Sequence, residues 1–118
     1  MKTLQGYAVI NKTSNINTLQ NIAAGIQHLN ITYENNIEDA VNAMSGQNFQ
    51  LLIIDKALPD AEIKKLNRLM ELLHPDAAIT AFNLQDEDYI RFKLSGLMLK
   101  WEEAQSGSKV NFIDNPEL

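Results

Sequence analysis

The chain of 118 residues is long enough for one domain with a single core and too short for two. Its formal charge of −5 and its 45% hydrophobic residues are typical of a soluble protein and argue against a nucleic-acid-binding surface, which needs clustered lysine and arginine. Cysteine is absent, which excludes disulfides and thiolate metal sites and is typical of a cytoplasmic protein; no apolar stretch approaches the roughly 20 residues that cross a bilayer.

The first predicted strand lies at residues 6–10, GYAVI, a short apolar run that ends in β-branched residues. The opening residues carry one lysine followed by polar residues and do not match a signal peptide. A turn-rich stretch follows, in which Ser14 or Asn15 is expected to cap a helix. From Ile16 to Leu29 apolar residues recur every three or four positions, which predicts an amphipathic helix.

The central part of the chain predicts a strand, a helix and a second strand. Residues 31–34, ITYE, form the brief first strand, and apolar side chains from Ile37 to Met44 predict a short helix that ends at Gly46. Residues 49–55, FQLLIID, are apolar for several consecutive positions. This pattern is expected of a parallel strand that helices cover on both faces.

The next segment begins at Pro59 and predicts a third helix with an apolar stripe over residues 63–73, ending before Pro75. The basic residues within it, KKLNR, fall on its solvated face. Residues 77–82, AAITAF, predict a fourth strand. A helix of about twenty residues, or roughly 30 Å, follows at residues 86–105, and residues 109–114, KVNFID, predict a last strand.

Strands and helices therefore alternate along the whole chain. This alternation predicts an α/β domain of three layers, α/β/α, in which helices wrap a doubly wound parallel sheet of five strands, all within residues 1–118. Ligands of such sheets bind at the carboxyl ends of the strands. Asp55 lies at that end of the third predicted strand and is the first candidate functional residue.

The stretch IIDKALP joins a buried strand to Asp55 and places Pro59 four positions later. Together with the order and lengths of the elements up to about residue 83, this motif resembles the receiver domain of two-component response regulators. The resemblance implies a flavodoxin-like fold with five strands. It also implies that Asp55 occupies the position of the phosphoacceptor.

The acidic pair that holds Mg²⁺ in receivers is missing, because Asn11 and Lys12 stand after the first strand. Phosphoryl transfer to a carboxylate needs a divalent ion to neutralise the assembled negative charge. Mg²⁺ is usually held through one or two carboxylates, so an amide and an ammonium group beside Asp55 form a poor site. We therefore expect no metal, and Lys12 is a candidate ion-pair partner of Asp55.

Two further positions depart from the receiver pattern. Receivers have a serine or threonine at the end of the fourth strand, where this chain has Phe82 and Asn83. They have a lysine at the end of the fifth strand, where this chain has Asn115. A rival alignment takes LMLK as the fifth strand and Lys100 as that lysine, at a short spacing from strand four. No segment after Pro116 forms the fifth helix, so we expect that helix to be missing or truncated.

The remaining candidates have simpler explanations. His28, in the first predicted helix, and His74, before Pro75, have no cysteine or carboxylate at ligand spacing, so we interpret them as surface or helix-end residues. The acidic stretch QDED at residues 85–88 is interpreted as a helix start that compensates the dipole, rather than as a metal site. No nucleotide-binding motif and no nucleophile elbow occur.

The long helix carries apolar residues on more than one face, which predicts an interface for a protein partner or a second copy of the chain. The alternative is that the helix bends at Ser95 and Gly96 and covers the face that a missing fifth helix would leave bare. The residues assigned to the expected interface are Tyr89, Phe92, Leu97, Met98 and Trp101.

The sequence thus favours a non-catalytic, receiver-like signalling or interaction module, a homodimer without cofactor, nucleic acid or membrane partners. Two alternatives stay open. One is a phospho-regulated receiver that uses Asp55. The other is a binder of a small polar ligand, or an enzyme, with Asn11, Lys12, Asp55 and Asn83 at the rim of its cleft.

Overall fold

The most apolar run of the sequence forms the centre of the sheet. In the computed structural model, which describes residues 3–105, strand β3 (Leu51–Asp55) is buried over its whole length. It lies between β1 (Leu4–Val9) and β4 (Ala78–Phe82), while β2 (Leu29–Glu34) flanks β1, so the strand order is β2-β1-β3-β4. All neighbouring strands pair in parallel, which confirms the predicted parallel α/β sheet.

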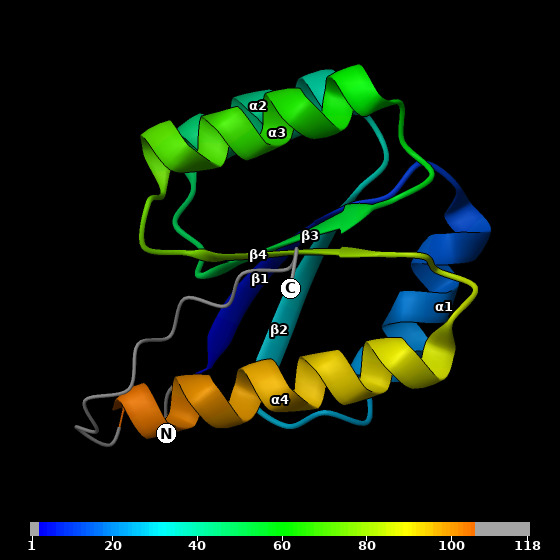
Figure 1. Cartoon of the computed structure of the whole chain (residues 1–118), viewed down its shortest axis with the longest axis vertical. Helices are drawn as coiled ribbons and strands as arrows, with labels where there is room; N and C mark the ends of the chain where they lie inside the picture. Colours follow the sequence, from blue (N-terminus) through cyan, green and yellow to red (C-terminus); the bar gives the residue numbers. More distant parts are fainter. Residues whose placement is uncertain (1–2, 106–118) are drawn as a thin grey trace.

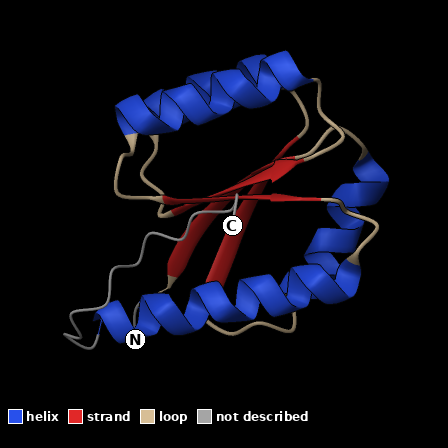
Figure 2. Cartoon of the chain, viewed as in Figure 1, coloured by secondary structure: helices blue, strands red, loops and turns tan. Residues whose placement is uncertain are grey.

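Helices on both faces of the sheet complete three layers (Figure 1). Helices α1 (Thr13–Ala23) and α4 (Glu87–Gln105) lie on one face, and α2 (Ile37–Gly46) and α3 (Asp60–Leu73) lie on the other. Figure 2 shows the strands enclosed between these two pairs. Alternate residues of each strand enter opposite cores, as the period of two along a strand requires. No helix among residues 3–105 is long and apolar enough to span a membrane.

Helix α4 turns one apolar face to the sheet and leaves a few apolar side chains on its outer side. Its buried face packs beside α1 against the sheet, so α1 and α4 together cover this face. Phe92 is 76% exposed and Leu99 62% exposed on the outer side. The buried residues of α4 are Ile90, Leu94, Leu97, Met98 and Trp101.

This packing corrects the expected interface. Leu97, Met98 and Trp101 belong to the chain's own core, so they offer no surface to a partner. Tyr89, at 42% exposed, and Phe92 remain accessible. The physical reason is that the side of a helix that faces a sheet must be apolar, and Leu97, Met98 and Trp101 lie on that side of α4.

The number of strands also differs from the expectation. Among the described residues the sheet has four strands instead of five. The predicted fifth strand, at residues 109–114, and Asn115 lie outside the described residues. The rival alignment that placed a strand at LMLK is wrong, because Lys100 and the three residues before it lie inside α4.

The first helix starts and ends earlier than predicted. Lys12 is its N-cap residue and its side chain makes no capping hydrogen bond, so the expected cap at Ser14 or Asn15 is wrong. The helix ends at Ala23, and His28 adopts a left-handed conformation with φ 64° in the turn that follows. The carbonyl of His28 accepts the backbone N–H of Leu4 at 2.8 Å, which places the start of β2 beside β1.

The second and third helices follow the sequence signals closely. Asn36 caps α2, because its side chain accepts the backbone N–H groups of Glu38 and Asp39 at 2.9 and 3.1 Å. Helix α2 ends at Gly46, as predicted. Helix α3 ends at Leu73, and the ring of His74, which follows it, lies 2.8 Å from the carbonyl oxygen of Met44.

Candidate functional site

Asp55 lies at the carboxyl end of β3 and is 1% exposed. One carboxylate oxygen, Oδ2, accepts a hydrogen bond from Nδ2 of Asn15 at 3.3 Å, and the other, Oδ1, accepts the backbone N–H of Ala57 at 2.8 Å. Both donors are neutral. The carboxylate is therefore buried and hydrogen-bonded, but no cation among residues 3–105 forms an ion pair with it.

Backbone contacts fix the end of β3 around this carboxylate. The N–H of Lys56 donates to the carbonyl of Phe82 at 2.9 Å, and the N–H of Leu58 donates to the carbonyl of Asp55 at 3.1 Å. The second bond closes a tight turn, after which Pro59 is the N-cap residue of α3 with φ −57°. Pro59 itself is exposed, so its contribution is to direct the chain into α3.

A chain of side-chain amides links Asp55 to the start of α4. Nε2 of Gln85 donates to Oδ1 of Asn15 at 3.4 Å, and the backbone N–H of Gln85 donates to Oδ1 of Asn83 at 3.0 Å. Asn15 is buried and stands at the centre of this network. The network joins α1, β3 and the loop after β4.

The sequence prediction did not include Asn15 or Gln85 among the site residues. Asn15 was expected only as a helix cap, and Gln85 only as part of an acidic helix start. A signal for Asn15 existed, since it precedes Leu19 by four positions and Ile22 by seven and so falls on the buried stripe of α1. A polar side chain on such a stripe needs a hydrogen-bonding partner in the core.

The groups that donate to the carboxylate do not come from Asn11 or Lys12. Both are exposed, and no ion pair joins Lys12 to Asp55, so the expected pairing is wrong. The physical reason is that Lys12 is the N-cap residue of α1, while Asn15, one turn further along, reaches the core. Asn83 is also exposed, and its side chain is engaged within its own loop.

On the fourth strand, Phe82 stands beside Asp55 in the β3–β4 register. Phe82 is fully buried and its ring meets the ring of Tyr89 edge-on, with centroids 6.2 Å apart. Thr80 is buried too, but it lies in register with Ile53, two positions before the strand end. An aromatic ring therefore occupies the place in which the receiver pattern has a hydroxyl group.

The residues at this site do not fit a magnesium ion. Within residues 3–105 no three histidine, cysteine or acidic side chains converge as a metal site would require. Mg²⁺ prefers carboxylate and water oxygens in octahedral geometry. Asp55 contributes one carboxylate whose two oxygens already accept hydrogen bonds.

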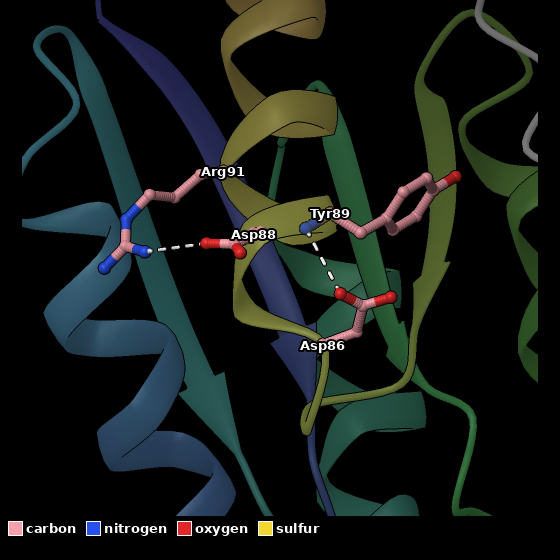
Figure 3. A network of polar contacts seen from close by, with 4 residues as sticks. All are labelled: Asp86, Asp88, Tyr89 and Arg91. Atoms are coloured by element: carbon pink, nitrogen blue, oxygen red, sulfur yellow. Dashed lines mark hydrogen bonds and ion pairs between the residues drawn. The ribbon is translucent and has the colours of Figure 1, made fainter.

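The acidic stretch before α4 has a structural explanation (Figure 3). Oδ1 of Asp86 accepts the backbone N–H of Tyr89 at 3.4 Å, and Asp88 forms an exposed ion pair with Arg91 at 3.8 Å. In Figure 3, Arg91 points to the α1 side of the helix and Tyr89 to the opposite side. Together with Glu87, these carboxylates lie in or next to the first turn, where the helix dipole favours negative charge.

Tyr7 of β1 is a buried titratable residue in the core between the sheet and helices α2 and α3. Its ring stacks on Phe49 with centroids 5.5 Å apart. Burial, and then the negative charges of Glu34 and Asp39, raise the pKa of Tyr7 from 10.0 to about 12. Burial also raises the pKa of Tyr33.

These shifts predict an alkaline loss of stability. The folded state keeps the Tyr7 phenol protonated, so its contribution is complete below pH 10 and is lost as the pH rises towards 12. We expect Tyr7→Phe to reduce the fall in unfolding free energy between about pH 9 and about pH 12 by up to about 2–3 kcal/mol, as measured by urea titration. Tyr33→Phe is the control; an equal effect of both substitutions would contradict the assignment to Tyr7.

Comparison with known proteins gave no match: no protein-family model, no curated protein and no solved structure matches this chain.

Proposed function

We propose that this chain is a non-catalytic, receiver-like module that acts through protein contacts in cytoplasmic signalling. The observation that carries the proposal is the state of Asp55, a buried carboxylate at the end of a central parallel strand whose oxygens both accept neutral N–H donors. The strand order and the helices on both sheet faces support the receiver-like part of the proposal. We also propose that the fold is flavodoxin-like.

We expect Asp55 to stay unphosphorylated, because its carboxylate is buried and no cation pairs with it among residues 3–105. A phosphoryl donor would bring further negative charge to a carboxylate that is 1% exposed and has no ion-paired cation among residues 3–105. Asn15 would also have to leave Oδ2 before that oxygen could attack phosphorus. Both requirements raise the barrier to the chemistry that a receiver performs.

A phospho-regulated receiver is the second candidate, favoured by the position of Asp55 at the strand end. Binding of a small polar ligand has less support, because Asn11 and Lys12 are exposed and neither donates a hydrogen bond to Asp55. The carboxylate itself is 1% exposed, so it offers little surface to such a ligand.

The test uses beryllofluoride and Mg²⁺, which together mimic a phosphorylated aspartate. We expect the NMR resonances of the Ala57 amide and the Asn15 side chain to stay unchanged when both reagents are added, because Asp55 remains engaged by these groups. Asp55→Asn is the control for nonspecific effects. A saturable shift in the wild-type protein that Asp55→Asn abolishes would establish the phospho-regulated alternative and end this proposal.

A second copy of the chain is the partner that we propose for this module. The exposed apolar side chains of α4, among them Phe92 and Leu99, leave hydrophobic surface on the described part of the chain. Sedimentation equilibrium at micromolar concentration measures the association directly. A protein that stays monomeric throughout would remove self-association and leave the argument about Asp55 unchanged.

A further inference from the structure

The large apolar side chains that stay exposed lie on two helices. Within residues 3–105 they are Leu72 and Leu73 at the end of α3 and Tyr89, Phe92 and Leu99 on α4. Leu72 is 72% exposed and Phe92 is 76% exposed, more than the other three. Because α3 and α4 lie on opposite faces of the sheet (Figure 1), these side chains form two separate surfaces instead of one patch.

On α3 the exposed apolar side chain follows a basic stretch. Lys64, Lys65 and Arg68 are exposed and precede Leu72. Arg68 lies four positions before Leu72, one turn away on the same side of the helix. Glu71 lies about 100° round the helix from Leu72 and so outside this side. We call Leu72 and the three basic residues the α3 surface.

On α4 the exposed apolar side chain follows an acidic stretch. The acidic residues 86–88 are exposed and precede Phe92. Asp88 lies four positions before Phe92, the same spacing that separates Arg68 from Leu72. We call residues 86–88 and Phe92 the α4 surface. The two surfaces therefore carry opposite charges at the same distance from an exposed apolar side chain.

The ion pair of Asp88 leaves the α4 surface accessible. The distance between Asp88 and Arg91 is 3.8 Å, and the side chain of Asp88 is fully exposed. Exposed pairs of this kind contribute little to stability. In Figure 3, Arg91 points to the α1 side of the helix, so its guanidinium lies beside the outer side of α4 rather than across it. Asp88 can therefore pair with a second cation.

The two helices run in the same direction. Each follows one of the parallel strands β3 and β4 and runs back along the sheet (Figure 1). In both helices the charged residues precede the exposed apolar residue, and the charges are basic in α3 and acidic in α4. Parallel packing of α3 from one copy on α4 from another therefore joins opposite charges at one end and apolar side chains at the other.

We propose that copies of this chain associate head to tail, with the α3 surface of one copy on the α4 surface of the next. The proposal deepens the self-association proposed above and rests on it. Arg68 pairs with Asp88 of the next copy, and Leu72 packs on Phe92 of that copy. Because the two surfaces lie on opposite faces of the sheet, a pair of copies keeps one surface of each kind free. Growth then continues as a filament or closes into a ring.

Charge complementarity argues that the occupant of each surface is the other surface of a second copy. Two α3 surfaces packed in parallel would bring the basic residues of both copies together, and packed antiparallel they would set Arg68 against Leu72. Two α4 surfaces would do the same with the carboxylates of residues 86–88 and Phe92. A two-fold symmetric contact of either helix with itself therefore lacks the match that the contact between α3 and α4 provides.

Sedimentation equilibrium of the full chain over a series of rising concentrations tests the head-to-tail arrangement without any substitution. We expect the average mass to rise past twice the monomer mass of 13.3 kDa, because every added copy exposes a further free surface. A plateau at twice the monomer mass would overturn the proposal, since it indicates a closed symmetric dimer. A monomer at every concentration would overturn it as well.

A mixture of two variants tests which surfaces meet. Leu72→Asn disables only the α3 surface and Phe92→Asn only the α4 surface, and both positions are exposed, so the core is unchanged. We expect each variant alone to associate about tenfold or more weakly than the unchanged protein. An equal mixture should form a one-to-one complex with the original affinity, because each variant supplies the surface that the other lacks. A mixture that associates no better than the separate variants would overturn the proposal.

Charge reversal tests the pairing of Arg68 with Asp88. Arg68→Glu sets two carboxylates against each other, and we expect it to weaken association by about tenfold. Asp88→Lys in the same chain restores opposite charges and should recover most of that loss. Lys56→Glu makes the same charge change in the exposed turn before α3 and is the control. Equal weakening by Lys56→Glu and Arg68→Glu, or no recovery in the double variant, would contradict the proposed pairing.

Failure of this proposal is distinguishable from failure of the proposed function. A protein that self-associates but whose two variants do not complement each other loses only the contact between α3 and α4. A protein that is monomeric at every concentration loses the proposed self-association as well. None of these substitutions alters Asp55 or its two hydrogen-bond donors, so the response to beryllofluoride is tested independently.

Discussion

Replacement of Leu94 by alanine is expected to lower the free energy of unfolding by about 2–5 kcal/mol. Leu94 is fully buried between α4 and the sheet, in the core that α1 and α4 share with β1, β3 and β4. Its truncation removes apolar contact and leaves a cavity that rigid neighbours do not fill. Urea denaturation followed by circular dichroism measures the loss.

Leu99→Ala is the matched control, since it makes the same chemical change in the same helix. Leu99 is 62% exposed, so we expect a change within about 0.5 kcal/mol. The pair tests the orientation of α4 directly. Equal costs at the two positions, or a larger cost at Leu99, would mean that α4 does not present Leu94 to the sheet.

Asn15→Leu is expected to lower the free energy of unfolding by about 2 kcal/mol, although leucine has a similar shape and a higher helix propensity. The leucine side chain cannot donate to Oδ2 of Asp55, which would leave half of a buried carboxylate without a donor. Asn17→Leu, at an exposed position of the same helix, is the control and should have little effect.

A double-mutant cycle isolates the charge of Asp55 from the packing of Asn15. In the Asp55→Asn background the carboxylate is gone, so Asn15→Leu should cost about 1 kcal/mol or less. Asp55→Asn alone should not lower the free energy of unfolding, because it removes a buried charge that only neutral groups stabilise. An undiminished cost of Asn15→Leu in that background would show that its hydrogen bond to Asp55 carries no stability.

Most of the fold was predictable because its signals are local. The consecutive apolar residues of β3 indicated a strand covered on both faces, and Gly46 and Pro75 marked helix ends within a residue or two of their places. The position of Asp55 at a strand end also followed from the sequence alone. The first helix was predicted too long because Ile26 and Leu29 continue its apolar spacing, whereas pairing of Leu29 with Leu4 draws that segment into β2.

The candidate site was predictable only in part. Asp55 was found from its place after an apolar run, but its partner Asn15 lies forty positions away and its distance depends on how α1 packs on the sheet. Lys12 carried the more obvious charge, yet the start of α1 turned it to solvent. The sequence therefore suggested the charged Lys12 as the partner of Asp55, whereas the packing of α1 provides the amide of Asn15.

The sequence by itself determined the alternation of strands and helices, because hydrophobic periodicity and turn residues act within a few positions. Only the tertiary structure decided which face of the sheet α4 covers, which of its apolar residues are core, and which side chains meet at Asp55. The face that α4 covers depends on the direction of the chain after β4, whereas the contacts of Asp55 depend on how α1 packs on the sheet. Helix α4 carries apolar stripes on two of its sides. Because only one side of α4 can face the sheet, one stripe is buried and the other stays exposed.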